Sequence, residues 1–134
     1  MEISGSFSPI DIAVSGMRAH NKHMGAISSN IANARTTDDG SGQPYRRLEG
    51  VFKADGEGIS SVSLSDIAQD MSPFHHNLQP GHPSADEQGY VSMPNVNLPI
   101  EMMNLSIATK AYQANAAILK RYQKMVETTL ELLR

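Results

Sequence analysis

Several residue types that anchor common classes of site are missing or scarce in this chain of 134 residues. It has no cysteine, which excludes disulfides and thiolate chemistry, and no tryptophan, with only three phenylalanines and four tyrosines. It has no run of 18 or more apolar residues, so direct membrane insertion is not expected, and no segment predicts a cleavable signal peptide. The sequence therefore supplies few bulky side chains for a dense core, at a length that suits one folding unit.

Positive charge is scarce where a nucleic-acid surface would need it. The net charge is -3, of which residues 1–34 carry none, residues 35–99 carry -5 and residues 100–134 carry +2. The basic pairs Arg46-Arg47 and Lys120-Arg121 are isolated, and no segment has a basic stripe, so nucleic-acid binding is not expected. Arg46 and Arg47 are interpreted mainly as solvated strand charges, with bridging to acidic neighbours as the alternative.

Histidines form the one cluster that suggests a metal or hydrolytic site. His75, His76 and His82 lie in a proline-containing stretch, residues 72–86, that is expected to be a loop. Their spacing matches no metal-binding or nucleophile motif, so neither a cofactor nor a small-molecule substrate is predicted. A small metal-dependent enzyme that uses this loop remains a remote alternative.

A first long helix is predicted from Ser8-Pro9 onward. Ser8 is an N-cap candidate, proline is favoured at the first helical position, and Asp11 complements the helix dipole. Apolar residues then recur every seven positions, in a stripe that only His20 interrupts. Asn33 is expected to end this helix in a left-handed conformation. Asn30 and Asn33 lie on one face, where their amide groups could fix the register of packed helices. The alternative is that Asn33 simply terminates the helix.

A second long helix is predicted from Pro99 to the C-terminus, because no further glycine or proline interrupts it. Two seven-residue series run along it, one through Ala111 and Ile118 and the other through Tyr112 and Leu119. This apolar face is broader than a two-stranded seam requires, so it is expected to contact more than one neighbour. Tyr112 is interpreted either as plain core or as part of a lock between subunits.

Between the helices, three strand-like runs separated by glycine-containing turns predict a small, mostly antiparallel β module. These runs are Tyr45 to Phe52, Ile59 to Leu64 and Tyr90 to Met93. The expected fold is α+β, with two terminal helices as an antiparallel coiled-coil stalk. The expected parts are residues 1–36, 37–98 and 99–134, of which the first and last form the stalk.

The length of the second helix indicates that this chain assembles with other subunits. At about 1.5 Å per residue the second helix would extend roughly 50 Å, too far to be hidden in its own globule. The excess apolar surface is therefore expected to be covered by other subunits. The positions expected at subunit interfaces are Ile10, Met17, Met24, Ile27, Asn30, Ile31, Asn33, Ile107, Ala111, Tyr112, Gln113, Asn115, Ile118, Leu119, Met125, Val126 and Leu132.

Both helices carry motifs that resemble a known family. The segments at 12–17 and 29–37 are similar to the N-terminal signature of flagellar rod and hook proteins, and those at 101–103 and 111–115 to their C-terminal signature. Between them, the stretches at 42–47, 72–74, 80–86 and 89–97 resemble the short proximal rod members of that family. The resemblance spans nearly the whole chain.

The resemblance implies a structural subunit of the basal-body rod that acts in motility. It implies assembly with copies of itself, other rod proteins, and components of the basal-body rings and the export apparatus. It also implies export without a cleavable signal, transmission of torque, a contribution to the export channel, and no catalysis. A soluble coiled-coil adaptor or a secreted effector with rod-like helices is the main alternative.

Overall fold

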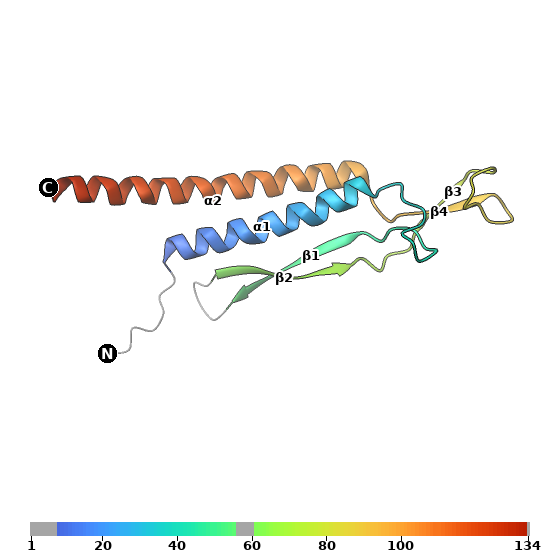
Figure 1. Ribbon diagram of the computed structural model, residues 1–134, viewed down its shortest axis with the longest axis horizontal. Helices are drawn as coiled ribbons and strands as arrows, with labels where there is room; N and C mark the ends of the chain where they lie inside the picture. The colour runs from blue at the N-terminus through green and yellow to red at the C-terminus, as the bar shows by residue number, and fades with distance from the viewer. Residues whose placement is uncertain (1–7, 56–60, 134) are drawn as a thin grey trace.

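The computed structural model describes residues 8–55 and 61–133. Its elements follow the order α1, β1, β2, β3, β4, α2, so a β-rich middle separates two terminal helices (Figure 1). The predicted α+β class, with two helices and small antiparallel sheets, is confirmed at this level.

Helix α1, Pro9–Ala32, begins where the sequence predicts. The Ser8 hydroxyl accepts from the Ile10 N–H at 3.3 Å, and the Ser8 N–H donates to the Asp11 carboxylate at 3.2 Å. Asn33 caps the other end, but its φ of -103° is not left-handed, so the predicted capping conformation is wrong. The Asn33 side chain instead donates to the Ser29 carbonyl at 2.9 Å, which satisfies a carbonyl of the last turn.

Helix α2, Leu98–Leu132, is the longest element, and it begins one residue before the predicted Pro99. The Asn97 side chain accepts from the Ile100 N–H at 3.3 Å and caps this start. The helix then continues to Leu132 without interruption, as the sequence predicts.

The two helices lie side by side and run in opposite directions (Figure 1). Asn30 contacts Glu101, Met24 contacts Thr109, and Gly16 lies against Asn115, so each step back along α1 is matched by one step along α2. Small side chains allow this close approach. The buried residues of the two helices include Ala13, Ala19, Ala26 and Ala108.

Strands β1, Leu48–Asp55, and β2, Ser61–Gln69, form an antiparallel pair with a bulge between Val51 and Phe52. The pair packs against α1, where the Phe52 ring contacts His20 and His23 at centroid distances of 5.6 and 5.1 Å. Both strands lie C-terminal to their predicted positions, and Ile59, the predicted start of the second, is outside the described residues. The predicted strand start at Tyr45 is wrong, because β1 begins at Leu48 and the Tyr45 N–H donates to the Thr36 carbonyl at 3.0 Å.

A second, separate antiparallel pair consists of β3, His75–Leu78, and β4, Tyr90–Met93. The sequence predicts β4 correctly but interprets β3 as loop, which is wrong. All four β3 residues are exposed, so no apolar alternation marked the strand, and pairing with β4 alone defines it. The β-rich middle is therefore two small sheets, one beside α1 and one beyond the ends of the helices (Figure 1).

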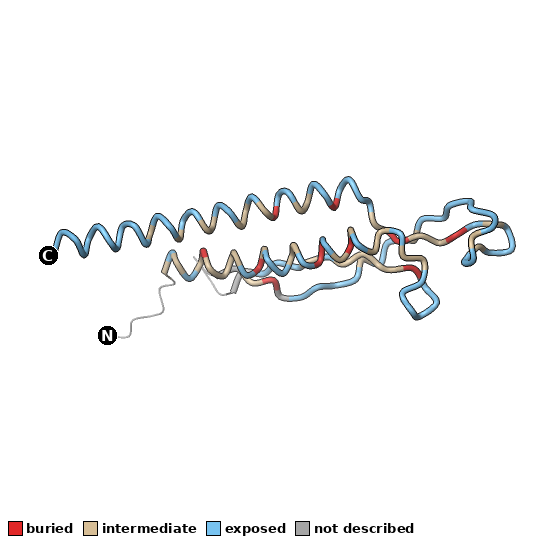
Figure 2. Tube along the Cα trace, turned by 45° about the horizontal axis from the view of Figure 1, so that its top comes forward, coloured by how far each residue is buried: buried red, intermediate tan, exposed pale blue. Residues whose placement is uncertain are grey.

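The core is thin and lies where α1 meets α2 and the β1–β2 pair. Buried positions occur along α1 and in the first half of α2, whereas the second half of α2 is largely exposed (Figure 2). The molecule therefore has a well-packed side and a long helix that its own chain covers only in part.

Gly16→Val is expected to destabilise the helix pair, because a Cβ atom at Gly16 would lie 2.8 Å from Nδ2 of Asn115. Because the Asn115 amide is a side-chain end that can rotate away, the cost is expected to be about 1 kcal/mol, which would appear as a lower urea midpoint of the helical circular-dichroism signal. Gly25→Val is the matched control, since nothing lies within 4 Å of a Cβ atom there. Equal stability of the two variants would contradict the close approach.

Stability of the packing between α1 and β1–β2 is expected to fall as the pH drops from 7.5 to 5.5. Burial, followed by the neighbouring His20, lowers the pKa of His23 from its usual 6.5. The unfolded chain therefore binds the proton more readily, so this stability is complete above pH 6.5 and declines below it. Urea unfolding at several pH values checks this. His23→Phe should flatten the dependence, whereas His75→Gln, on the exposed strand β3, should keep it.

Candidate functional site

A cluster of buried and half-buried polar side chains ties the helices to the β-rich middle, and it is called the junction below. Its members are Asn30, Asn95 and Glu101, which are buried, and Arg47 and Asp70, which are half-buried. Asn30 is fully buried on α1, and its side chain forms four hydrogen bonds. Nδ2 donates to the Leu48 carbonyl at 2.8 Å and to Glu101 at 3.1 Å, while Oδ1 accepts from the Leu48 N–H at 2.8 Å. One amide therefore joins α1 to β1 and to α2.

Among the junction residues, Glu101 has the largest free-energy cost of removal from water, because its carboxylate is only 1% exposed. Nε of Arg47 donates to Oε1 of Glu101 at 2.6 Å, while Nη1 lies 3.4 Å from Asp70. Burial by itself would lower the pKa of Arg47, but the hydrogen bond and charge of Glu101 outweigh it and raise that pKa. Arg47 therefore stays charged in the folded chain.

Asn95 and Asp70 extend the junction to the segments around the second sheet. Oδ1 of Asn95 accepts from the Arg47 N–H at 2.9 Å, and Nδ2 donates to the Asp70 carbonyl at 2.9 Å. The Ser72 N–H and hydroxyl, and then Arg47, lower the pKa of Asp70. Arg46 lies outside this cluster, donates to the Asp70 and Ser72 carbonyls, and stacks over Phe74 at 4.2 Å.

These contacts correct the expected roles of Arg46 and Arg47, and they distinguish the roles of Asn30 and Asn33. Arg46 and Arg47 are not simply solvated strand charges, because both bind partners in the chain itself. Asn30 does fix a register, although it does so within one chain. Asn33 terminates its helix, which is the simpler of its two interpretations.

The sequence did not single out Glu101 or Asn95 as site residues, although Glu101 carries a recognisable signal. It lies seven residues before Ala108 and fourteen before Asn115, on the side of α2 that faces α1. An acidic residue on such a face requires a buried partner, but the sequence gives no means of choosing among the arginines.

The structure places the predicted interface positions in three settings. Ile27 and Asn30 are buried by the chain's own elements, so in this conformation they do not reach another subunit. Half-buried positions along the two helices are Ile10, Met17, Met24, Ile31, Asn33, Ala111, Tyr112, Asn115 and Leu119. Exposed positions on α2 are Ile107, Gln113, Ile118, Met125, Val126 and Leu132.

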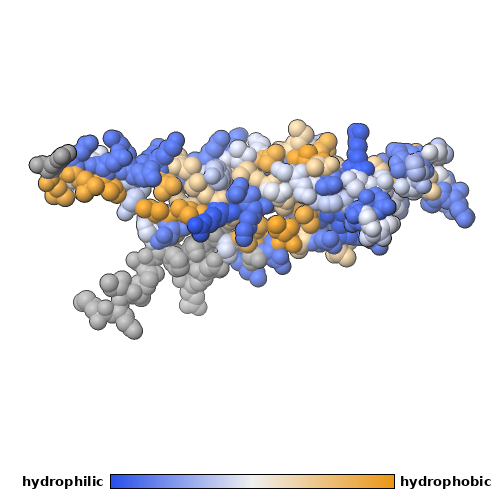
Figure 3. Space-filling view, in the orientation of Figure 1, coloured by the Kyte–Doolittle hydropathy of each residue, from blue (hydrophilic) through white to orange (hydrophobic). Residues whose placement is uncertain are grey.

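The end of α2 extends past the start of α1. Because the helices match residue for residue, Pro9 lies level with about residue 122, and residues 123–133 project beyond it. This segment, called the overhang below, is exposed at every position. Apolar surface is visible along its underside (Figure 3). Its exposed large apolar residues are Met125, Val126, Leu130, Leu132 and Leu133.

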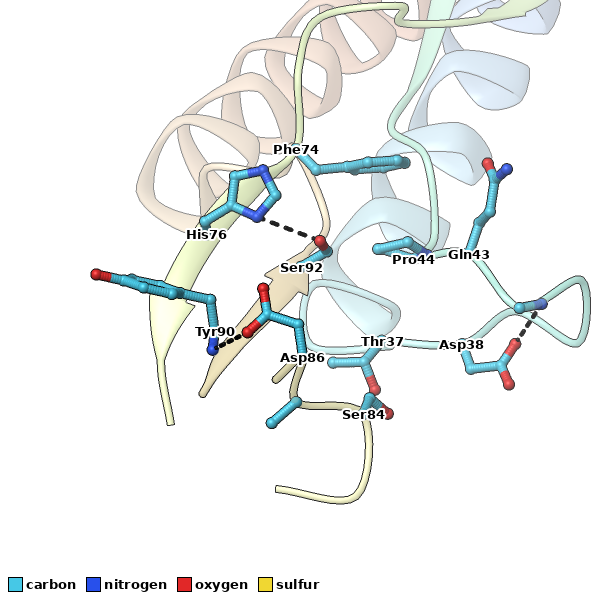
Figure 4. Close-up of a pocket in the computed structure, with 12 residues that line it drawn as sticks. Thr37, Asp38, Gln43, Pro44, Phe74, His76, Ser84, Asp86, Tyr90 and Ser92 are labelled. Carbon is cyan, nitrogen blue, oxygen red and sulfur yellow. Dashed lines mark hydrogen bonds between the residues drawn. The ribbon is translucent and has the colours of Figure 1, made fainter. Parts of the chain in front are cut away.

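The histidine-containing region lies at the opposite end of the molecule. It borders a cavity of about 450 Å³ between the loop at residues 37–44 and the second sheet (Figure 4). His76 lies within hydrogen-bond distance of Ser92, and His82 accepts from the Ser84 N–H. Within residues 8–55 and 61–133, no three histidine, aspartate or glutamate side chains are grouped to hold a metal ion.

Neither helix of the described chain has both the length and the apolar character needed to cross a membrane.

Comparison with known proteins matches the chain to flagellar rod proteins at two levels. Residues 87–132, which include β4 and α2, match the family described as flagellar basal body rod FlgEFG protein C-terminal. The basal-body rod protein FlgC of Agrobacterium fabrum is 37% identical over 127 residues, covering 92% of this chain and 91% of that protein. The chain belongs to the FlgC family.

Other FlgC relatives agree along nearly their full lengths. FlgC of Salmonella typhimurium is 38% identical, covering 91% of this chain and 93% of the relative. FlgC of Borreliella burgdorferi is 35% identical, covering 97% and 99%. The predicted resemblance is therefore confirmed, and the chain is a structural subunit of the flagellar basal-body rod. For an FlgC protein, the features to explain are the exposed helix surfaces and the junction that orients them.

Arg47→Met is expected to destabilise this FlgC chain by about 3 kcal/mol, because it leaves the Glu101 carboxylate buried without its cation. Urea unfolding monitored by circular dichroism checks this. Arg46→Met, the neighbouring control, should cost less, about 1–2 kcal/mol, because it loses a partly exposed stack over Phe74 and two 3.2 Å hydrogen bonds to carbonyls but leaves no buried charge unpaired. Adding Glu101→Leu to Arg47→Met should recover part of the loss. An Arg47→Met chain as stable as wild type would refute this role for the pair.

Proposed function

We propose that the chain is a torque-transmitting subunit of the proximal rod, in the part of the basal body that spans the periplasm. The exposed apolar surface of α2 carries this proposal. Ile118 is 48% exposed, Met125 57% and Leu132 83%, although all three lie on one seven-residue series. A helix with this surface gains burial only from neighbouring molecules.

In this proposal α1 and α2 form an antiparallel coiled-coil stalk in the wall of a tube. Residues 1–36 and 99–134 make the inner part of the tube and contribute to the export channel, and residues 37–98 face outward. The close helix contacts at Gly16 and Met24 support the stalk, because a rigid pair transmits twist better than two independent helices. The junction supports it further by fixing how the stalk meets the two sheets.

The partners proposed are copies of the chain, other rod proteins, and components of the rings and the export apparatus. The exposed and half-buried positions on the helices are proposed to contact them, whereas Ile27 and Asn30 hold the subunit together. No catalysis is proposed, because the proposed role rests on packing surfaces and requires no chemical step.

Ile118→Asp is expected to abolish swimming and incorporation into basal bodies, because an unpaired carboxylate cannot be buried cheaply in a helix seam. The isolated chain should keep its stability within about 0.5 kcal/mol, since Ile118 is already exposed there. Soft-agar motility, basal-body purification and urea unfolding provide the three measurements.

Ala117→Asp is the matched control, since it puts the same charge one residue away, at another exposed position of α2. It should retain swimming. A motile Ile118→Asp strain would exclude Ile118 from the seam, and equal loss in both variants would show that any charge here is harmful.

A further inference from the structure

One side of the helix pair is hollowed where α1 meets α2. A groove of about 660 Å³ lies there, lined by Ile31 of α1 and by a segment of α2. The α2 residues that line it are Leu98, Met102, Leu105, Ser106, Thr109, Lys110 and Gln113. Its lining is mostly apolar at the centre, and it has a single charged group, a cation, among the described residues.

A second hollow lies between the helices, closer to the start of α1. Met17 lies on the same stripe of α1 as Ile31, two seven-residue steps away, and it lines this hollow together with Tyr112 and Leu119. This second hollow also has a cation, Arg18, in its lining. Two hollows thus lie along the helix pair, and each has one cation in its lining.

The overhang has the complementary character. It has five exposed apolar side chains and two glutamates, of which Glu127 pairs with Lys124 at 3.6 Å, so Glu131 is the acidic group that has no ion pair among the described residues. At about 1.5 Å per residue the overhang is about 15 Å long and the groove, from Leu98 to Gln113, about 22 Å. The overhang, an amphipathic helix shorter than the groove, therefore fits within the length of the groove.

A chain cannot place its own overhang in its own groove, because both belong to one continuous helix, with the groove at its start and the overhang at its end (Figure 1). The occupant must come from another molecule. Apolar surface on both the overhang and the groove, with Glu131 in one and Lys110 in the other, favours a second copy of this chain.

We propose that the overhang of one copy packs in the groove of a second copy, an inference that rests on the proposed rod function. The contact joins two different surfaces, so a pair keeps a free groove at one end and a free overhang at the other. Repetition of such a contact builds an open helical assembly instead of a closed dimer. The same contact would cover apolar side chains of the overhang that a lone chain leaves in water.

Site-specific cross-linking in assembled basal bodies tests this contact, and the absence of native cysteine gives a clean background. Two differently tagged copies are expressed together, one with Met102→Cys in the groove and the other with Leu130→Cys in the overhang. A bismaleimide should yield a dimer of the two tags, whereas either cysteine variant alone should yield none. Gln113→Cys serves as a second groove position if Met102→Cys disturbs assembly.

Ala117→Cys with Leu130→Cys is the control pair, since Ala117 is exposed but does not line the groove. Lys110→Glu should lower the yield of the mixed dimer about two- to fivefold, and Glu131→Lys in the other copy should restore it.

Basal bodies that contain both copies but cross-link no better than the control pair would overturn the groove contact and leave the rod function intact. Absence of even the cysteine-free chain from basal bodies would overturn the rod function and the contact together.

Discussion

Burial of the Glu101 carboxylate is the constraint on which the arrangement of the other elements depends. A carboxylate removed from water is tolerated only with a paired cation and further donors, which here are Arg47 and Asn30. Glu101 is on α2, Arg47 immediately precedes β1 and Asn30 is on α1, so this cluster forms only when all three parts are in place. The junction thus makes one end of the molecule cooperative and fixes the direction in which the helices leave it.

At the opposite end of the molecule, α2 is not covered by the rest of the chain. From the junction to Asn115, α2 is held close to α1 by small residues, and from about residue 123 it continues alone. Rigidity at one end and uncovered apolar surface at the other suit a subunit that must hold its shape and also bind its neighbours. A lone subunit leaves the overhang in water, and the proposed contact with a second copy would bury it.

Local signals accounted for the parts of the fold that the sequence predicted. Ser8, Pro9 and the seven-residue series act within one or a few turns, so they predicted both helices to within a residue at most ends. Strand β3 and the position of the β1–β2 pair beside α1 were missed. Strand β3 has no apolar alternation, and the placement of β1–β2 depends on Phe52 meeting histidines about 30 residues earlier in the chain.

The sequence by itself determined the family, the two helices and the apolar surplus of α2, because these depend on motifs and on periodicity along the chain. Only the tertiary structure decided which of those positions are covered. Asn30 meets Glu101 across 71 residues and Arg47 meets it across 54, and no local pattern specifies such partners. The division between Asn30, which holds the subunit together, and Ile118, which stays exposed, follows from where α1 begins and from which side of each helix the chain itself covers.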